Sequence, residues 1–337
     1  MLGERFRLWQ ADSPVGRVLG APFTRALLAL LIIFAVGMLF HADGAFFKWG
    51  THRDMLRHIS RYGILACGMT VVIISGGIDL SVGSVLGLVA VISSLLCIHW
   101  GMSPLLAVPL CLLAGLACGV TSGALVARFR VQPFIATLAM MVFARGLAKY
   151  ISGGQKISRG MQTTEGFVYL DEPRLFTFLN TQILGNNLAV VTIIFLVCIG
   201  ISWLVLTKLP IGRYMYAVGG SEDAARLSGV PVAMTKVLAY GMCGLFAALA
   251  GICQAAQETH GDPEAGATYE LTAIAIVVIG GTNLMGGRGN ALLTLLGALT
   301  IGYLEKILSI NAVGEAGRLI LTGLIIVTAV LFQRGEK

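Results

Sequence analysis

The residues best suited to chemistry lie in one short stretch, residues 75–84, with the sequence S-G-G-I-D-L-S-V-G-S. It separates two long apolar runs, residues 64–74 and 85–98, and it contains the carboxylate of Asp79. In lipid, a broken backbone is tolerated only where protein buries it or where it lines a water-filled cavity. An ionisable residue at such a break indicates a functional site, and unwound helices recur at transporter sites. The stretch therefore predicts a transport protein.

Asp79 has three candidate roles at this first break. The pattern favours a cap for a helix that starts at Leu80, with the carboxylate accepting from the backbone N–H of Ser81 or Val82. The carboxylate could also form a gate or an interhelical bond, or it could contact the transported molecule. The candidate site residues of the first break are Gly76, Gly77, Asp79, Ser81 and Gly83.

A second glycine-rich interruption, residues 280–290, has the sequence G-G-T-N-L-M-G-G-R-G-N. Like the first, it follows an Ile/Val-rich run and precedes another apolar segment. Two such breaks in corresponding halves favour a duplicated transporter architecture, and chance similarity of glycine-rich apolar sequence is the alternative. Its candidate site residues are Gly280, Gly281 and Asn283.

The composition places these breaks in a membrane. Hydrophobic residues make up 56% of the 337 residues and charged residues only 12%, against roughly 25% charged in soluble domains. The cysteines fall in apolar runs without metal-binding spacing, so we expect buried thiols and no metal site. The net charge of +7 suits anionic lipid, and the basic residues form no polar cluster that would favour nucleic acid.

Hydropathy predicts an all-α polytopic bundle of about ten spans, some broken by glycine, in a single domain, residues 1–337. The expected spans are residues 23–40, 62–74, 85–98, 105–127, 134–151, 188–206, 237–256, 269–279, 291–308 and 319–332. Residues 152–187 form the expected outer loop and residues 208–236 the expected cytoplasmic loop. Basic residues flank the first and last spans, which indicates that both termini are cytoplasmic.

Two segments near the spans carry further signals. Arg53, Arg57 and Arg61 recur every four residues in residues 51–61, which predicts an amphipathic helix in the membrane interface. Alternation of the spans puts this basic helix outside, against the positive-inside expectation. Arg145 lies within a span and must face protein or water.

A small-residue face runs along the span at residues 105–127. Gly115, Gly119 and Gly123 repeat every four residues and allow close approach of another helix. The pattern favours packing within the chain over a seam between two copies.

The loop of residues 208–236 contains a well-signalled short helix. Ser221 is a suitable N-cap, Glu222 and Arg226 form an i,i+4 pair, and Gly229 is placed to end the helix. The pattern allows either an interfacial connector or a helix that couples to a soluble motor, where Ala225 would approach a partner groove. The candidate coupling residues are Gly219, Gly220, Ser221, Glu222, Ala225, Arg226 and Gly229.

Five blocks together resemble the permease subunit of ribose-type ABC sugar importers, which include ribose, arabinose, galactofuranose and xylose systems. They are residues 75–84, V-Q-P-F-I-A-T-L at 131–138, residues 212–230, Y-E-L-T-A-I-A-I-V-V-I-G-G-T at 269–282, and G-G-R-G at 286–289. They stand in the family's order and cover most of the chain from Tyr62 onward.

The resemblance implies a bacterial inner-membrane subunit that works with a second permease copy, a pair of cytoplasmic ATPases and a periplasmic sugar-binding protein. It implies that residues 212–230 couple to the ATPase, which would hold ATP and Mg²⁺, so that this chain binds no cofactor. It also adds Gln132, Phe134 and Thr137 as candidate path residues, although Gln132 before Pro133 is more typical of a helix start.

Three other classes stay open or are disfavoured. A branched-chain amino-acid or nucleoside ABC permease shares the general plan. A secondary transporter would need intramembrane charges to couple an ion, and Asp79 is the one carboxylate well inside a pair of spans. A membrane enzyme is disfavoured because the sequence contains no H-E-x-x-H, G-x-S-x-G or P-loop motif.

Overall fold

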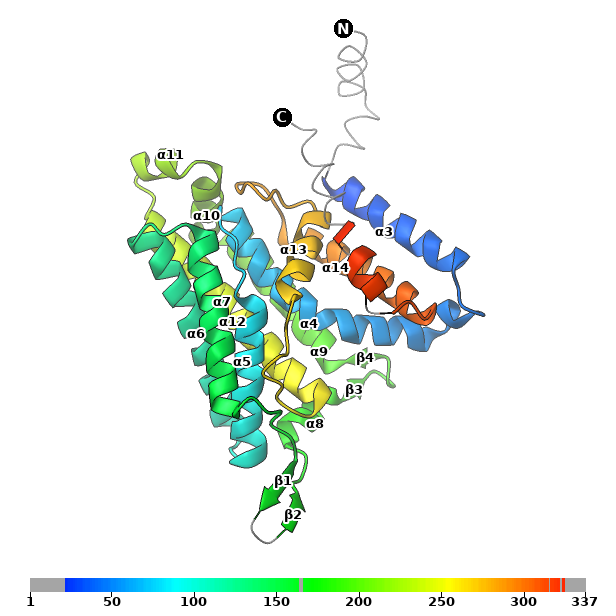
Figure 1. Cartoon of the computed structure of the whole chain (residues 1–337). Coiled ribbons are helices and arrows are strands. Elements are labelled where there is room, and N and C mark those ends of the chain that lie inside the picture. Colours follow the sequence, from blue (N-terminus) through cyan, green and yellow to red (C-terminus); the bar gives the residue numbers. More distant parts are fainter. Residues whose placement is uncertain (1–21, 164–165, 315, 322, 325–337) are drawn as a thin grey trace.

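The computed structural model describes residues 22–163, 166–314, 316–321 and 323–324. This part of the chain is mostly helical, and a small pair of strands projects from one end of the helical bundle (Figure 1). The helices are α3 (Pro22–Leu39), η1 (Ala45–Phe47), α4 (Trp49–Ile74), α5 (Val82–Ser94), η2 (Leu95–His99), α6 (Pro104–Arg128), α7 (Pro133–Ser152), α8 (Arg174–Asn180), α9 (Val190–Lys208), α10 (Pro210–Gly220), α11 (Glu222–Leu227), α12 (Val232–Glu258), α13 (Tyr269–Ile279) and α14 (Ala291–Ile310). The strands are β1 (Gly160–Thr163), β2 (Gly166–Tyr169), β3 (Gln182–Ile183) and β4 (Leu188–Ala189).

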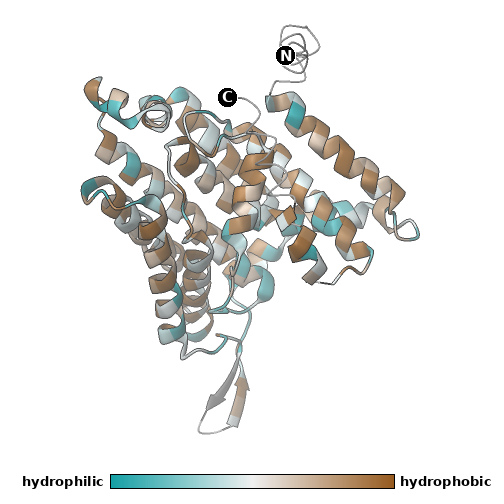
Figure 2. Cartoon of the chain, turned by 45° about the horizontal axis from the view of Figure 1, so that its top comes forward, coloured by the Kyte–Doolittle hydropathy of each residue, from teal (hydrophilic) through white to brown (hydrophobic). Residues whose placement is uncertain are grey.

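Seven described helical segments are long and apolar enough to cross a membrane, namely α3, α5 with its π-helical continuation η2, α6, α7, α9, α12 and α14. Apolar residues dominate these helices in Figure 2. The prediction of a polytopic helical membrane protein is confirmed. The number of spans and the side of each terminus stay predictions, because most of the expected last span, residues 319–332, lies outside the described residues.

The expected span at residues 269–279 is wrong as a full crossing. Helix α13 has 11 residues, and a rise of 1.5 Å per residue makes it about 17 Å long. The hydrocarbon core of a bilayer is about 30 Å thick. Helix α13 therefore crosses only part of it, and the preceding residues 259–268 continue the segment as non-helical chain.

The helix predicted at residues 51–61 is present as the first half of α4, a single helix of 26 residues, and its place in the membrane interface stays a prediction. Arg61 is buried and donates to the Gln254 side chain on α12. Arg53 donates to the Asn186 carbonyl, between β3 and β4, and Arg57 donates to the side chain of Asn180 at the end of α8, each at 2.9 Å. The three arginine side chains are thus held by other parts of the chain.

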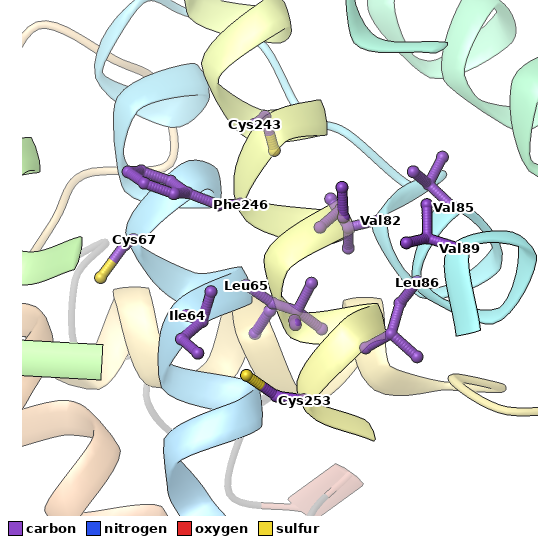
Figure 3. Packing of buried hydrophobic residues seen from close by; sticks show 14 of the residues in the cluster. Ile64, Leu65, Cys67, Val82, Val85, Leu86, Val89, Cys243, Phe246 and Cys253 are labelled. Atoms are coloured by element: carbon purple, nitrogen blue, oxygen red, sulfur yellow. The ribbon is translucent and has the colours of Figure 1, made fainter. Parts of the chain in front are cut away.

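The core of the bundle is formed by α4, α5 and α12 (Figure 3). Leu65 of α4, Leu86 of α5 and Cys253 of α12 are all fully buried there. All seven cysteines are free and buried, as expected for small apolar side chains. Lipid tails are as apolar as leucine, so association of these helices depends on close packing rather than on removal from water.

Helix α12 also packs along α6, and their closest contacts are backbone to backbone. A Cβ atom at Gly119 would lie 2.2 Å from the Tyr240 carbonyl oxygen, and one at Gly115 would lie 2.4 Å from that of Gly244. The small-residue face of α6 is therefore buried within the chain, as predicted.

The outer loop, residues 152–187, has more structure than the sequence suggested. Strands β1 and β2 pair antiparallel, α8 follows, and β3 pairs with β4 at the start of α9. An isolated bridge joins Ile157 to Gly261, and the Lys156 ammonium lies 2.9 Å from the Asp262 carboxylate. The loop is thus attached to residues 259–268, which lead into α13.

The close packing of α6 on α12 makes a stability prediction. Gly119→Ala is expected to lower the free energy of unfolding by about 1–3 kcal/mol, because the new methyl group overlaps the α12 backbone. The melting temperature of the purified protein is therefore expected to fall. Gly146→Ala in α7 is the matched control, since a Cβ there meets no atom within 4 Å. Equal melting temperatures for the two variants would contradict the packing.

Candidate functional site

Three glycine-rich segments that are far apart in the sequence meet at one point. They are the first break, the end of α10 and the second break, and they touch through Gly76, Gly219, Gly286 and Gly287, which we call the glycine junction. A Cβ atom at Gly219 would lie 1.8 Å from the Ile74 carbonyl oxygen, and one at Gly286 would lie 2.9 Å from the Gly76 Cα. No side chain larger than hydrogen fits at these contacts without movement of the backbone.

Hydrogen bonds fasten the same three segments together. The Gly287 N–H donates to the Ile74 carbonyl at 3.0 Å, which satisfies a carbonyl that the end of α4 leaves without a helical partner. The Tyr216 hydroxyl of α10 donates to the Gly289 carbonyl at 2.8 Å. Helix α10 is thereby connected to both breaks, directly at Gly219 and through Tyr216.

Asp79 lies buried in the first break, with 1% of its surface exposed. Its Oδ1 accepts hydrogen bonds from the Ser81 N–H at 2.9 Å and from the Ser81 hydroxyl at 2.6 Å, and the Cys243 thiol of α12 adds a further contact. The predicted acceptor role toward the Ser81 N–H is present. The helix begins at Val82 rather than at Leu80, so the carboxylate orders the turn before α5.

Two other helices contact the first break at the Ile78 carbonyl. The Thr137 hydroxyl of α7 and the Tyr240 hydroxyl of α12 each donate to it at 3.4 Å. A Cβ atom at Gly77 would lie 2.4 Å from the Tyr240 hydroxyl oxygen. The break is therefore enclosed by α7 and α12.

The structure separates the candidate residues of 131–138. It brings the buried Thr137 to the first break. Gln132 and Phe134 are exposed on the surface, and Phe134 is 58% exposed. Gln132 is the N-cap residue of α7, with Pro133 in its first turn, which confirms the expected helix start.

Sequence reasoning missed the segment that faces the start of α5, residues 259–268. A Cβ atom at Gly83 would lie 2.1 Å from the Gly266 carbonyl oxygen and 2.7 Å from a Glu270 carboxylate oxygen. The Arg145 guanidinium of α7 donates to the Pro263 and Ala265 carbonyls. The intramembrane arginine thus faces protein, as expected. The sequence signal for the contact with residues 259–268 was the four-residue spacing of Gly83 and Gly87, because Gly87 also faces this segment.

In the second break, polar side chains organise the loop itself. The side-chain oxygen Oδ1 of Asn283 accepts from the Met285 N–H at 3.0 Å. The backbone N–H of Asn283 donates to the Arg288 carbonyl, also at 3.0 Å. Asn290, which the sequence analysis did not single out, caps α14 by accepting from the Leu292 N–H at 2.9 Å. Gly281 has a φ of +87°, and a Cβ at Gly280 would lie 2.6 Å from the Leu293 carbonyl oxygen.

The predicted short helix is present as α11, and a longer helix, α10, precedes it. The Ser221 hydroxyl accepts from the Ala224 N–H at 3.3 Å, Arg226 donates to Glu222 at 2.7 Å, and Gly229 has a φ of +80°. Lys236 of α12 also binds Glu222, and this hydrogen bond lowers the pKa of the Glu222 carboxyl, with Arg226 adding to the effect. Helix α11 is therefore anchored to the start of α12.

The expected contact of Ala225 with a partner groove is wrong. Ala225 is 4% exposed and packs against Val218 of α10 and Val232 of α12. A helix of six residues needs this apolar contact because it has too few backbone hydrogen bonds to be stable alone. Leu227, by contrast, is a large apolar side chain of α11 that is 90% exposed.

The long apolar helices, the two glycine breaks and the docked α10–α11 pair define a polytopic membrane protein of the broken-helix transporter class. Residues 53–330 match the family described as branched-chain amino acid transport system / permease component, and the chain belongs to this family.

Several curated proteins are similar along nearly the whole chain. The ribose import permease protein RbsC of Escherichia coli (strain K12) is 39% identical over 316 residues, which cover 93% of this chain and 94% of the relative. RbsC of Bacillus subtilis (strain 168) is 39% identical over 284 residues, 84% of each chain. The fructose import permease protein FruF of Bifidobacterium longum is 33% identical, covering 96% of this chain and 90% of the relative. No solved structure matches the chain.

The glycine junction makes a prediction for two neighbouring residues. Gly219→Ala is expected to lower transport strongly and to lower the melting temperature, because the added methyl group overlaps the Ile74 carbonyl. Gly220→Ala is the matched control and is expected to behave like the parent protein, since a Cβ there meets no atom within 4 Å. Similar losses in both variants would show that the backbone contact at Gly219 is not responsible.

A second prediction tests the role of the Asp79 carboxylate. Asp79→Asn keeps an oxygen acceptor for the Ser81 N–H and is expected to retain most transport activity, whereas Asp79→Ala loses the acceptor and about 1–2 kcal/mol of stability. Melting temperature and transport are measured for both variants. If Asp79→Asn abolishes transport at an unchanged melting temperature, the negative charge is required and the capping role is insufficient.

Proposed function

We propose that this chain forms the membrane path of an ATP-driven sugar importer and that ribose is the first candidate among its sugars. The observation that carries the proposal is the 39% identity to ribose import permeases over more than nine-tenths of both chains. Fructose import permeases are 33–34% identical, which makes fructose the second candidate. These relatives favour a sugar over a branched-chain amino acid.

The proposed path runs beside the two breaks and the segment of residues 259–268. In the described conformation, α7 and α12 enclose Asp79, and Gly83 lies against Gly266. Sugar passage then requires these backbone segments to separate. Arg145 holds residues 259–268 by their carbonyls, so we assign it a positioning role in closing the path.

The glycine junction supports a simple mechanism for coupling. Where backbone touches backbone, no side chain can change rotamer to absorb a displacement. A shift of α10 is therefore transmitted to the Ile74 end of α4 and to the second break together. Helix α11 moves with α10, because Ala225 packs against Val218.

The remaining parts of the importer are separate subunits in this proposal. A cytoplasmic ATPase would hold ATP and Mg²⁺, since the chain carries no P-loop sequence. A binding protein would deliver the sugar at the outer face, where β1 and β2 project from the bundle. A second permease, identical or related, would complete the path.

The function is tested by uptake of labelled sugar in cells that produce the chain together with its ATPase and binding protein. Labelled ribose is expected to enter, and excess unlabelled ribose is expected to suppress the uptake while leucine leaves it unchanged. The purified chain alone is expected to hydrolyse no ATP. Uptake that leucine suppresses, or ATP hydrolysis by the chain alone, would overturn the assignment.

The exposed edge of α11 gives a prediction for the ATPase contact. Leu227→Asp is expected to reduce the amount of ATPase retained in a pull-down several-fold while the melting temperature of the permease is unchanged, because Leu227 is 90% exposed. Leu184→Asp, at an exposed leucine near β3, is the matched control. Ala225→Trp is expected to lower the melting temperature, since it disrupts packing within the chain. Normal ATPase retention by Leu227→Asp would exclude this edge as the contact.

A further inference from the structure

A cavity of about 500 Å³ lies at the end of the molecule that carries α10 and α11. It opens between the end of α6 and the connection from α11 to α12. Three arginines contribute to its wall, with apolar residues between them. Its lining residues are Ala127, Arg128, Arg130, Arg226, Val230, Pro231, Val232, Ala233 and Met234, and we call it the arginine pocket.

The charges of the arginine pocket are unbalanced. Arg226 shares the Glu222 carboxylate with Lys236. Arg128 and Arg130 are exposed, and the described residues provide neither of their side chains with a hydrogen bond or an ion pair. Two guanidinium groups are therefore available for an anion, and the fork of an arginine matches two oxygens of a phosphate.

Exposed apolar side chains continue from the pocket along two long apolar helices. Met234 and Leu238 of α12 are 61% and 39% exposed, and Val120 of α6 is 38% exposed. A Cβ atom at Gly241 of α12 would lie 3.3 Å from a Val120 methyl carbon, so the exposed side chains of the two packed helices form one apolar surface. Phe129, between the two free arginines, is 70% exposed.

The pocket lies near the level of a membrane surface. Helix α9 ends at the same end of the molecule as α6, and there the Lys208 ammonium lies 5.6 Å from the centre of the Trp203 ring. Paired aromatic and basic residues at the end of a span are typical of the interface between hydrocarbon and water. Arg128 is in the last turn of α6, and Arg130 follows the helix. Both free arginines are thus within reach of lipid headgroups.

We propose that the arginine pocket binds one anionic phospholipid, with the phosphate on Arg128 and Arg130 and an acyl chain along the exposed apolar surface of α6 and α12. Basic pockets between membrane helices select anionic headgroups through charge. A lipid satisfies both parts of the site, because the apolar surface lies on helices that are long and apolar enough to cross a membrane. The lipid would bridge α6 to the start of α12, next to the anchor of α11.

The test is native mass spectrometry of the purified chain titrated with phosphatidylglycerol or with phosphatidylcholine of the same acyl chains. The parent protein is expected to retain one phosphatidylglycerol in preference to phosphatidylcholine. The double variant Arg128→Gln/Arg130→Gln is expected to weaken that binding about 30-fold, from the contribution typical of two basic residues at an anionic surface. The matched control is Lys48→Gln/Arg174→Gln, which removes two exposed basic residues elsewhere and is expected to leave the binding unchanged.

Two further measurements distinguish other occupants. Glycerophosphoglycerol, the headgroup without acyl chains, is expected to bind far more weakly, and equal binding would mean a site for small anions and overturn the proposal. A pull-down of the ATPase in lipid-free detergent is expected to be unaffected by Arg128→Gln/Arg130→Gln. Loss of the ATPase with unchanged lipid binding would assign the pocket to the ATPase and overturn the proposal. Equal affinity of the parent protein for phosphatidylglycerol and phosphatidylcholine would also overturn it.

Discussion

The structure depends on the backbone contact at the glycine junction. Gly76, Gly219 and Gly286 approach one another so closely that a single carbon added at Gly219 or Gly286 would overlap the neighbouring chain. The Gly287 N–H then completes the hydrogen bonding of α4 at Ile74. Hydrogen-bonded backbone in a closely packed contact is stiff, so the two membrane breaks and the α10–α11 pair form one mechanical unit. This arrangement connects the α10–α11 pair directly to both glycine breaks.

On the other side of the first break, side chains take part in the contact as well as backbone. Residues 259–268 lie against Gly83 and Gly87 of α5, and the Arg145 guanidinium holds them by two carbonyls. A cation bonded to backbone oxygens satisfies groups that non-helical chain would otherwise leave unpaired in the membrane. The bridge from Ile157 to Gly261 and the Lys156–Asp262 ion pair attach the same residues to the loop that follows α7.

Helix α11 shows how a short element gains stability from its neighbours. Its cap at Ser221 and its Glu222–Arg226 pair are local, but Ala225 faces Val218 and Val232, and Lys236 holds Glu222 from α12. The inward side of α11 is therefore used within the chain. Its exposed apolar side chain is Leu227, and Arg226 of α11 lines the adjoining arginine pocket.

What the sequence by itself determined depends on interactions between residues that are close together in the chain. Apolar runs predicted the membrane helices, glycine clusters predicted both breaks, and the four-residue repeat in α6 predicted a close helix contact, because each signal lies within one segment. The cap at Ser221 and the helix start at Pro133 were predicted for the same reason. Only the tertiary structure decided that residues 74, 219 and 287 meet, since no periodicity encodes contacts across such separations. It also decided that α13 is a partial span, that Ala225 faces inward and that the arginines of α4 bind protein, because each depends on which neighbour occupies the adjoining space.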